Sequence, residues 1–376
     1  MTIEAQVTRT SGVASGRDLG LDAARSSGIL LVVLGHALIR SLDIVAPGAP
    51  DGVLLSGIGT VRMTPFADIA LTLIYSFHMP LLAYVSGHAF SRSSVGYGAR
   101  FIARRASGLL IPYLAWLLVA WVLAGDLRLA ALGSFVGSAI LDPQSPGGLW
   151  FLYALFGSAT LLAAGMRLGG SDRTLIASAL LAGVLGVLPL GAYGNLFGLS
   201  DIAWLYPFVV AGVLAARHRT ALEHATWLTP LSMALWVASL PLVWPVLVPG
   251  PRWWAADVAA LAGVLGPAAT LVPKALWALI RVIGALAGTY AVFQLAGRLR
   301  GRSLAVAAWL GRRTLGIYAT HGHVLLYVAP LVASFAAPVR TVALFATGMT
   351  AAVILTLALE TMPVTRRVFL GTRSPG

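Results

Sequence analysis

The chain is 376 residues long, 58% hydrophobic and only 10% charged. A soluble domain usually carries about 25% charged residues, so a soluble globular protein is excluded. The formal net charge of +13 comes almost entirely from arginine, since Lys274 is the only lysine. The arginines fall between apolar segments rather than in one patch, which argues against a nucleic-acid partner. With no cysteine, the chain has neither disulfides nor thiolate chemistry.

The first apolar run, at about 23–41, carries ionisable side chains on one stripe. Arg25 and His36 are 11 positions apart, close to three helical turns, so they share a helix face. Asp22, three residues before Arg25, joins the same face. Ionisable groups in a membrane span are costly and point into a protein interior or a wet cavity. The run therefore predicts a spanning helix with a functional site rather than a cleaved signal peptide.

Apolar runs that approach the roughly 20 residues of a membrane span recur along the chain. Eleven candidates fall at about 23–41, 66–90, 107–125, 148–166, 174–191, 202–216, 228–248, 254–273, 275–297, 314–333 and 339–361. Arginines cluster after the second, fourth and sixth runs. The loops at 42–65, 126–147 and 192–201 are poorer in arginine. The positive-inside rule then predicts a cytoplasmic N-terminus.

One run must be removed if the five arginines between residues 298 and 313 are to face the cytoplasm. We interpret 254–273, which contains Asp257 and a Gly266-Pro267 break, as interfacial or re-entrant. The expected fold is all-α, a polytopic integral membrane helical bundle of about ten transmembrane helices, with eleven possible. We expect a cytoplasmic tail over 1–21, a transmembrane domain over 22–362 and a second cytoplasmic tail over 363–376.

The second run contains Phe77-His78-Met79-Pro80 and continues to Ser86-Gly87-His88. Proline removes one backbone hydrogen bond and tends to kink a helix, which can open a cavity. A plain packing kink is the alternative. Ser86 lacks the surrounding motif of a serine nucleophile.

A further polar patch lies between Gly311 and His321. Thr314, Tyr318 and His321 fall at i, i+4 and i+7, on one helix face. Arg312 and Arg313 precede this face and could bind phosphates or simply anchor the helix. A histidine between membrane helices is often only a structural hydrogen-bonding residue. No His-x-x-x-His pair or nearby carboxylate cluster is present in these runs, so we expect no metal site.

Four segments carry a resemblance to a known family. They are Asp22-x-x-Arg25 followed by ten residues and His36, Phe77-His78-Met79-Pro80 to Ser86-Gly87, Arg104-Arg105 leading to Leu110-Ile111-Pro112-Tyr113, and Gly311 to His321. The segment Leu149-Trp150-Phe151-Leu152-Tyr153 reinforces them. In this order the chain resembles the acyltransferase-three family of bacterial membrane proteins, particularly its fucose 4-O-acetylase-like branch.

The resemblance implies a ten-helix acyltransferase of the bacterial inner membrane. Such an enzyme transfers an acyl group, usually acetyl, from a cytoplasmic acyl-CoA such as acetyl-CoA. The acceptor is a hydroxyl of a surface polysaccharide, a lipid-linked glycan or a glycosylated metabolite. Arg25 and His36 match the family's Arg-x10-His pair.

We expect His36 to act as general base or to carry the acyl group, with Asp22 orienting Arg25. Coenzyme A phosphates would bind Arg25 together with Arg104, Arg105 or Arg312. The residues expected to bind the acceptor or support the site are His78, Ser86, Trp150, Tyr318 and His321.

Two other functions remain open from the sequence. A multi-pass transporter or flippase also has charged groups inside its bundle. A non-catalytic scaffold for glycan assembly would leave the aligned Arg25 and His36 unexplained. Oligomeric state is not readable from the sequence.

Overall fold

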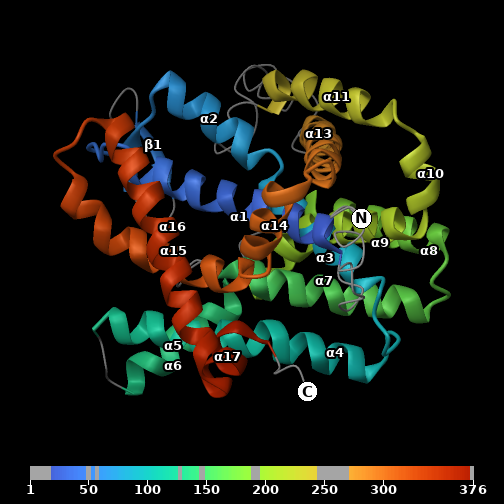
Figure 1. Cartoon of the computed structure of the whole chain (residues 1–376), viewed down its shortest axis with the longest axis horizontal. Coiled ribbons are helices and arrows are strands. Elements are labelled where there is room, and N and C mark those ends of the chain that lie inside the picture. The colour runs from blue at the N-terminus through green and yellow to red at the C-terminus, as the bar shows by residue number, and fades with distance from the viewer. Residues whose placement is uncertain are drawn as a thin grey trace, which may run out of the picture.

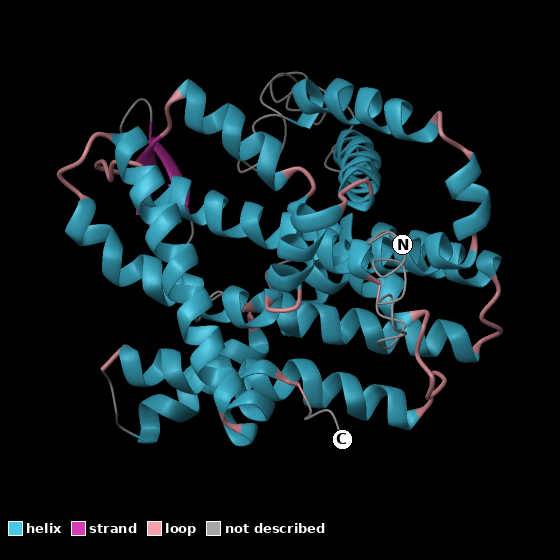
Figure 2. Cartoon of the chain, in the orientation of Figure 1, coloured by secondary structure: helices cyan, strands magenta, loops and turns pink. Residues whose placement is uncertain are grey.

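The computed structural model describes residues 18–47, 52–55, 59–125, 129–143, 149–187, 195–243 and 271–372. Over these residues the chain is a bundle of α-helices with one short β-hairpin (Figure 2). Seven described helical stretches are long and apolar enough to cross a membrane. They are Leu19–Arg40, Pro65–Phe90, Ala99–Leu123, Leu196–Arg217, Ala275–Gly297, Thr314–Val332 and Ala337–Thr361.

Shorter apolar helices cover Leu132–Leu141 and Leu228–Val243. The predicted polytopic membrane bundle is therefore confirmed. The number of ten spans stays a prediction, because most of the segment interpreted as interfacial or re-entrant, 254–270, lies outside the described residues.

The elements follow in chain order, and Figure 1 labels the α-helices and strand β1. Up to residue 187 they are α1 (Leu19–Arg40), β1 (Gly52–Leu55), β2 (Gly59–Arg62), α2 (Pro65–Tyr75), α3 (His78–Phe90), α4 (Ala99–Arg105), η3 (Ala106–Leu110), α5 (Ile111–Leu123), α6 (Leu129–Leu141), α7 (Trp150–Arg167) and α8 (Asp172–Val187). The remainder are η5 (Leu196–Gly198), α9 (Leu199–Arg217), α10 (Arg219–His224), α11 (Leu228–Val243), α13 (Leu271–Gly297), α14 (Gly301–Gly311), α15 (Thr314–Val328), η8 (Ala329–Val332), α16 (Ala337–Thr361) and α17 (Pro363–Leu370).

The second predicted run is broken into two helices. Pro80 has no N–H to donate to the carbonyl of Ser76, so one helical hydrogen bond is missing there. Accordingly α2 ends at Tyr75, and α3 begins at His78. Pro80 then lies in the first turn of α3, where a missing N–H costs nothing. The expected kink at Pro80 is thus a break between the two helices, just before the proline. This break places His78 at the start of α3.

A similar irregularity precedes Pro112. The single turn of π-helix η3 joins α4 to α5, so the third span is not a uniform α-helix. The carbonyl oxygen of Gly108 in η3 lies against Gly371, which ends α17 with a φ of +61°. Trp116 donates its indole hydrogen to the carbonyl of Phe369 at 3.0 Å. The last helix is therefore docked on the π-turn and on α5.

Two segments predicted as loops contain regular structure. The stretch 42–65 holds the antiparallel hairpin β1–β2, and 126–147 holds α6. Strands of four residues and a small, glycine-containing helix give weak sequence signals, which explains why a span-length search passes over them. The arginine-rich stretch before residue 313 likewise contains α14, which packs along α1.

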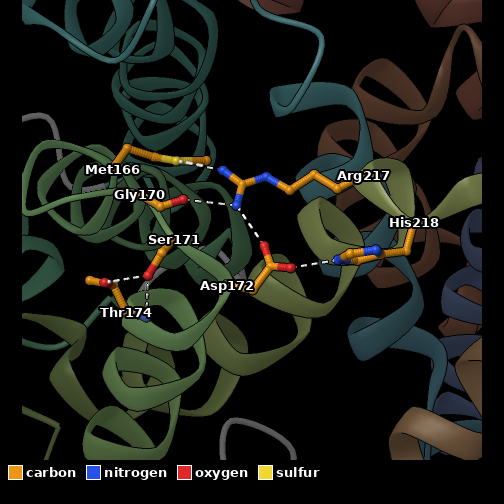
Figure 3. A network of polar contacts seen from close by, with 7 residues as sticks. All are labelled: Met166, Gly170, Ser171, Asp172, Thr174, Arg217 and His218. Atoms are coloured by element: carbon orange, nitrogen blue, oxygen red, sulfur yellow. Dashed lines mark hydrogen bonds and ion pairs between the residues drawn. The ribbon is translucent and has the colours of Figure 1, made fainter.

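Polar contacts tie the helix ends together near the arginine-rich loops. Arg217, at the end of α9, donates to the Asp172 carboxylate and to the Gly170 carbonyl, both at 2.8 Å (Figure 3). The imidazole of His218 lies 2.5 Å from the other oxygen of Asp172 (Figure 3). The hydrogen bonds from Arg217 and then His218 hold the pKa of Asp172 below its usual value. The start of α8 is thereby fixed to the end of α9.

Candidate active site

An ion pair lies in the first turns of α1, against the end of α14. Arg25 donates to the Asp22 carboxylate at 2.6 Å, and Asp22 is only 1% exposed. A Cβ at Gly311 would come within 1.7 Å of the Asp22 carbonyl oxygen. Only glycine therefore allows α14 to approach α1 so closely, and this contact sets the position of the turn that leads into α15.

Further along the same face of α1, His36 meets His321 of α15. Nδ1 of His36 lies 2.8 Å from Nε2 of His321. The two rings are nearly parallel, with centroids 4.9 Å apart and planes 22° from each other. Helices α1 and α15 thus bring together two histidines that are 285 residues apart in the sequence.

The hydrogen-bond partners define which nitrogen of each histidine carries a hydrogen. Nδ1 of His321 lies 3.0 Å from the carbonyl of Ile317, which can only accept. His321 Nδ1 is therefore the donor, and in a neutral ring its Nε2 is the acceptor. His36 must then donate from Nδ1 to that Nε2, because one hydrogen has to lie between the two rings. The Nε2 of His36 is left with a lone pair, available to bind a proton or to attack a carbonyl carbon.

The two histidines of the pair differ in burial. His321 is 2% exposed, whereas His36 is only partly buried. A buried, doubly hydrogen-bonded His321 is held in one orientation. His36 is therefore the more exposed residue of this pair.

Tyr318 lies next to this histidine pair. Its ring centroid is 5.9 Å from that of His321 and 5.8 Å from that of Phe151 in α7. Trp150, the first residue of α7, is half-buried, and its ring lies 6.1 Å from that of Phe151. Two of the residues expected at the site, Tyr318 and Trp150, are therefore linked to His321 through one row of aromatic rings.

His78 and Ser86 make hydrogen bonds to carbonyls one helical turn earlier in the chain. Nδ1 of His78 donates to the Ile74 carbonyl at 2.9 Å, and the His78 ring lies edge-on to Tyr75, with centroids 4.7 Å apart. Tyr75 in turn packs against Gly35, the neighbour of His36. Ser86 donates to the Leu82 carbonyl at 2.7 Å, so its hydroxyl hydrogen is committed within α3.

The expected phosphate-binding arginines differ in their surroundings. The guanidinium of Arg105 lies over the rings of Phe90 and Phe101, 4.3 and 5.0 Å from their centroids. It is also within electrostatic range of Arg25 and Arg104. Arg104 and Arg312 are exposed. Arg105 therefore has two further positive charges in its neighbourhood, which favours an anionic ligand there.

One structural ion pair at the site was not predicted. Arg313 donates to Glu360 of α16 at 2.9 Å and to the Trp309 carbonyl at 3.0 Å. Its guanidinium also stacks on the Trp309 ring, 4.1 Å from the centroid. Glu360 is the only acidic residue in the last apolar run. A lone carboxylate in such a run was the one sequence feature that could have predicted a buried ion pair. The pair fixes the α14–α15 turn, and with it the register of the helix that carries His321.

Among the residues that the structure describes, no group of three or more histidine, cysteine, aspartate or glutamate side chains is placed to hold a metal ion. The described polar groups of the site are instead a histidine pair, a carboxylate–arginine pair and a set of arginines. Such a set can move a proton and bind a phosphorylated ligand.

Known proteins share part of this sequence. A nodulation protein NolL from Sinorhizobium fredii is 31% identical over 235 residues, 58% of this chain and 57% of that protein. A nodulation protein NolL from Mesorhizobium japonicum is 26% identical over 208 residues, 54% of this chain and 49% of that protein. The chain therefore spans about half the length of these curated relatives. No solved structure matches it.

The model of the acyltransferase-3 family, described as an acyltransferase domain, matches residues 18–360. This match contains both α1 and α15 and so includes the whole histidine pair. The chain thus belongs to the acyltransferase-3 family, and its described helices are those of a multi-pass membrane protein.

Proposed function

We propose that this enzyme transfers an acyl group, most simply acetyl, from a cytoplasmic acyl-CoA to a hydroxyl of a carbohydrate-containing acceptor. Acceptors of this class include a surface polysaccharide, a lipid-linked glycan and a glycosylated metabolite. The observation that carries the proposal is the contact between His36 and His321, because it leaves the His36 Nε2 unprotonated in a membrane acyltransferase.

The reaction needs a base at the acceptor hydroxyl. The hydroxyl oxygen attacks the thioester carbonyl carbon, the carbon–sulfur bond breaks, and His36 Nε2 takes the hydroxyl proton and delivers it to the departing thiolate. While His36 is cationic, its Nδ1–H remains bonded to His321, and this hydrogen bond becomes charge-assisted and stronger. His321 is therefore a positioning residue in this scheme.

The same Nε2 lone pair also suits a two-step reaction. In that alternative it attacks the thioester first and carries the acyl group, which the acceptor hydroxyl then removes. Both routes use the same orientation of His36, so the roles of His321 and Ile317 are unchanged between them.

The donor would be held at the arginine-rich end of the bundle. Coenzyme A bears a pyrophosphate and a ribose phosphate, and arginine binds phosphate through paired N–H donors. Arg25 and Arg104 lie within electrostatic range of Arg105, and the three would bind these phosphates together, with Arg312 as a further exposed cation. Asp22 would keep Arg25 in place. No metal ion is needed for this scheme.

The acceptor would be bound on the aromatic side of the histidine pair. Tyr318 and Trp150 offer ring faces and polar hydrogens suited to a sugar, and His78 approaches from the α2–α3 break. Ser86 would support the packing of α3, since its hydroxyl is bonded within that helix.

The proposed topology follows the arginine placement. Both termini would be cytoplasmic, with ten spans in a bacterial inner membrane and a transmembrane domain over 22–362. The curated relatives come from bacteria, which supports that membrane.

Transfer can be tested in membrane vesicles from native cells supplied with radiolabelled acetyl-CoA on the cytoplasmic face. The readout is hydroxylamine-labile label in extracted glycans, lipids and glycosylated metabolites. We expect label with the wild type and with His224→Ala, a histidine exposed on α10, and none with His36→Ala. Equal labelling by His36→Ala, at equal protein in the membrane, would refute the role of His36.

A further inference from the structure

Arg281 is a cation inside the long apolar helix α13, in the span Ala275–Gly297. Its guanidinium lies over the Trp204 ring of α9, 4.4 Å from the centroid, and 5.3 Å from the centroid of Trp277, one turn earlier on α13. The planar guanidinium therefore lies between two indole rings, one from each of two helices. Neither indole neutralises its charge.

Several other arginines at described helix interfaces have carboxylate partners, whereas Arg105, like Arg281, lies over aromatic rings. Arg25 pairs with Asp22, Arg313 with Glu360, and Arg340 with Asp43. Within the described ranges, no carboxylate forms an ion pair with Arg281, and its buried Nε has no hydrogen-bond partner. A guanidinium inside a membrane protein ordinarily pairs with an anion, because the lost hydration must be replaced. Stacking on tryptophan replaces only part of it.

The surroundings of Arg281 indicate where an anion would come from. Leu279 and Ile283, two positions before and after Arg281, are 54% and 46% exposed, and at 100° per residue they lie on the opposite, lipid-facing side of α13. The Arg281 residue itself is only partly buried. A charged group at the membrane surface can therefore reach the exposed part of the Arg281 side chain.

The depth of Arg281 matches a lipid headgroup. Sixteen residues separate it from Gly297, at the arginine-rich end of α13, which corresponds to about 24 Å along a helix. The hydrocarbon core is about 30 Å thick, so Arg281 lies near the opposite interface. Tryptophan is also enriched at such interfaces.

We propose that Arg281, clamped between Trp204 and Trp277, binds the phosphate of a membrane lipid in the leaflet opposite the arginine-rich loops. Phosphate fits the fork of a stacked guanidinium, which presents two parallel N–H donors to paired oxygens. The site is separate from the histidine pair and does not depend on the proposed acyl transfer.

Native mass spectrometry of the full chain, delipidated in an uncharged detergent, tests this site with phosphatidylglycerol as the probe. We expect the wild type to retain one lipid and Arg281→Gln to bind at least tenfold more weakly. The matched control is Arg340→Gln, which removes a cation already paired with Asp43, and it should bind within twofold of the wild type. Equal affinity of Arg281→Gln and wild type would overturn the proposal.

Two further arms separate a phosphate clamp from a simple surface charge. Arg281→Lys keeps the charge but loses the planar fork, so it should bind several-fold more weakly than the wild type; affinity equal to the wild type would contradict the clamp. Trp204→Leu keeps Arg281 and should also weaken binding, which covers the case in which Arg281→Gln fails to fold.

The source of the phosphate is tested with two other probes. A diacylglycerol, which has the same chains and no phosphate, should bind wild type and Arg281→Gln equally weakly. Inorganic phosphate at the concentration of the lipid should leave phosphatidylglycerol bound. Displacement by inorganic phosphate would overturn the lipid assignment and indicate a free-anion site.

Discussion

Replacing His321 by alanine removes the hydrogen-bond acceptor that orients His36, the proposed catalytic base. The His36 Nδ1–H, now 2.8 Å from His321 Nε2, would lose its partner inside the bundle. An unsatisfied buried donor costs about 1–3 kcal/mol, and the upper end applies in the transition state, where His36 is cationic. At about 1.4 kcal/mol per tenfold in rate, the acyl transfer should slow by roughly 10- to 100-fold.

The glutamine variant makes this prediction specific to one atom. The glutamine side-chain oxygen can be placed near the position of His321 Nε2, so His321→Gln should keep more activity than His321→Ala. The assay is the initial rate of label transfer from acetyl-CoA in vesicles, normalised to protein in the membrane. His224→Ala serves as the control for loss of a histidine on an exposed helix. If His321→Ala, correctly inserted, transfers at the wild-type rate, the hydrogen-bond reasoning is refuted.

Three further predictions concern the frame around the site. Gly311→Ala places a Cβ within 1.7 Å of the Asp22 carbonyl, so thermal unfolding in detergent should show a loss of about 1–3 kcal/mol; an unchanged melting temperature would contradict the close approach. Glu360→Gln removes the partner of Arg313 and should lower the melting temperature more than Glu360→Asp does; equal values for both variants would argue against a structural ion pair. Asp172 has a pKa lowered from 3.8 by its arginine and histidine partners, so its contribution to stability is present above about pH 4 and lost as the pH falls through the lowered pKa. Wild-type melting temperature should therefore fall more between pH 6 and pH 3 than that of Asp172→Asn, and parallel pH profiles would refute this linkage.

Periodicity and charge placement were sufficient to predict the membrane bundle. The runs at 23–41 and 314–333 correspond to α1 and to α15 with η8, because long apolar segments with few charges have one stable solution in a bilayer. The proline in the second run also signalled an interruption, although the break lies at residues 76–77 rather than at Pro80. Short elements such as α6 and the β-hairpin lacked the length that makes a span recognisable.

The candidate site was only partly readable from the sequence. Helical spacing put Asp22, Arg25 and His36 on one face of α1. Which residues share a face of one helix depends only on their spacing in the sequence. The meeting of His36 with His321 depends on how α1 and α15 pack, and no periodic pattern within one helix encodes that. The same holds for Arg313 and Glu360, whose pairing spans 47 residues and needs the α14–α15 turn to lie against the end of α16.

The most direct test of the account compares the acyl esters of native cells that carry the intact gene, a deletion, His36→Ala or His224→Ala. Mass spectrometry of surface glycans, lipids and glycosylated metabolites would identify the acceptor and the acyl group together. The account predicts that one carbohydrate ester disappears in the deletion and in His36→Ala, and persists in His224→Ala. An unchanged ester profile in the deletion strain, with one unmodified molecule accumulating inside the cells, would contradict it and indicate transport.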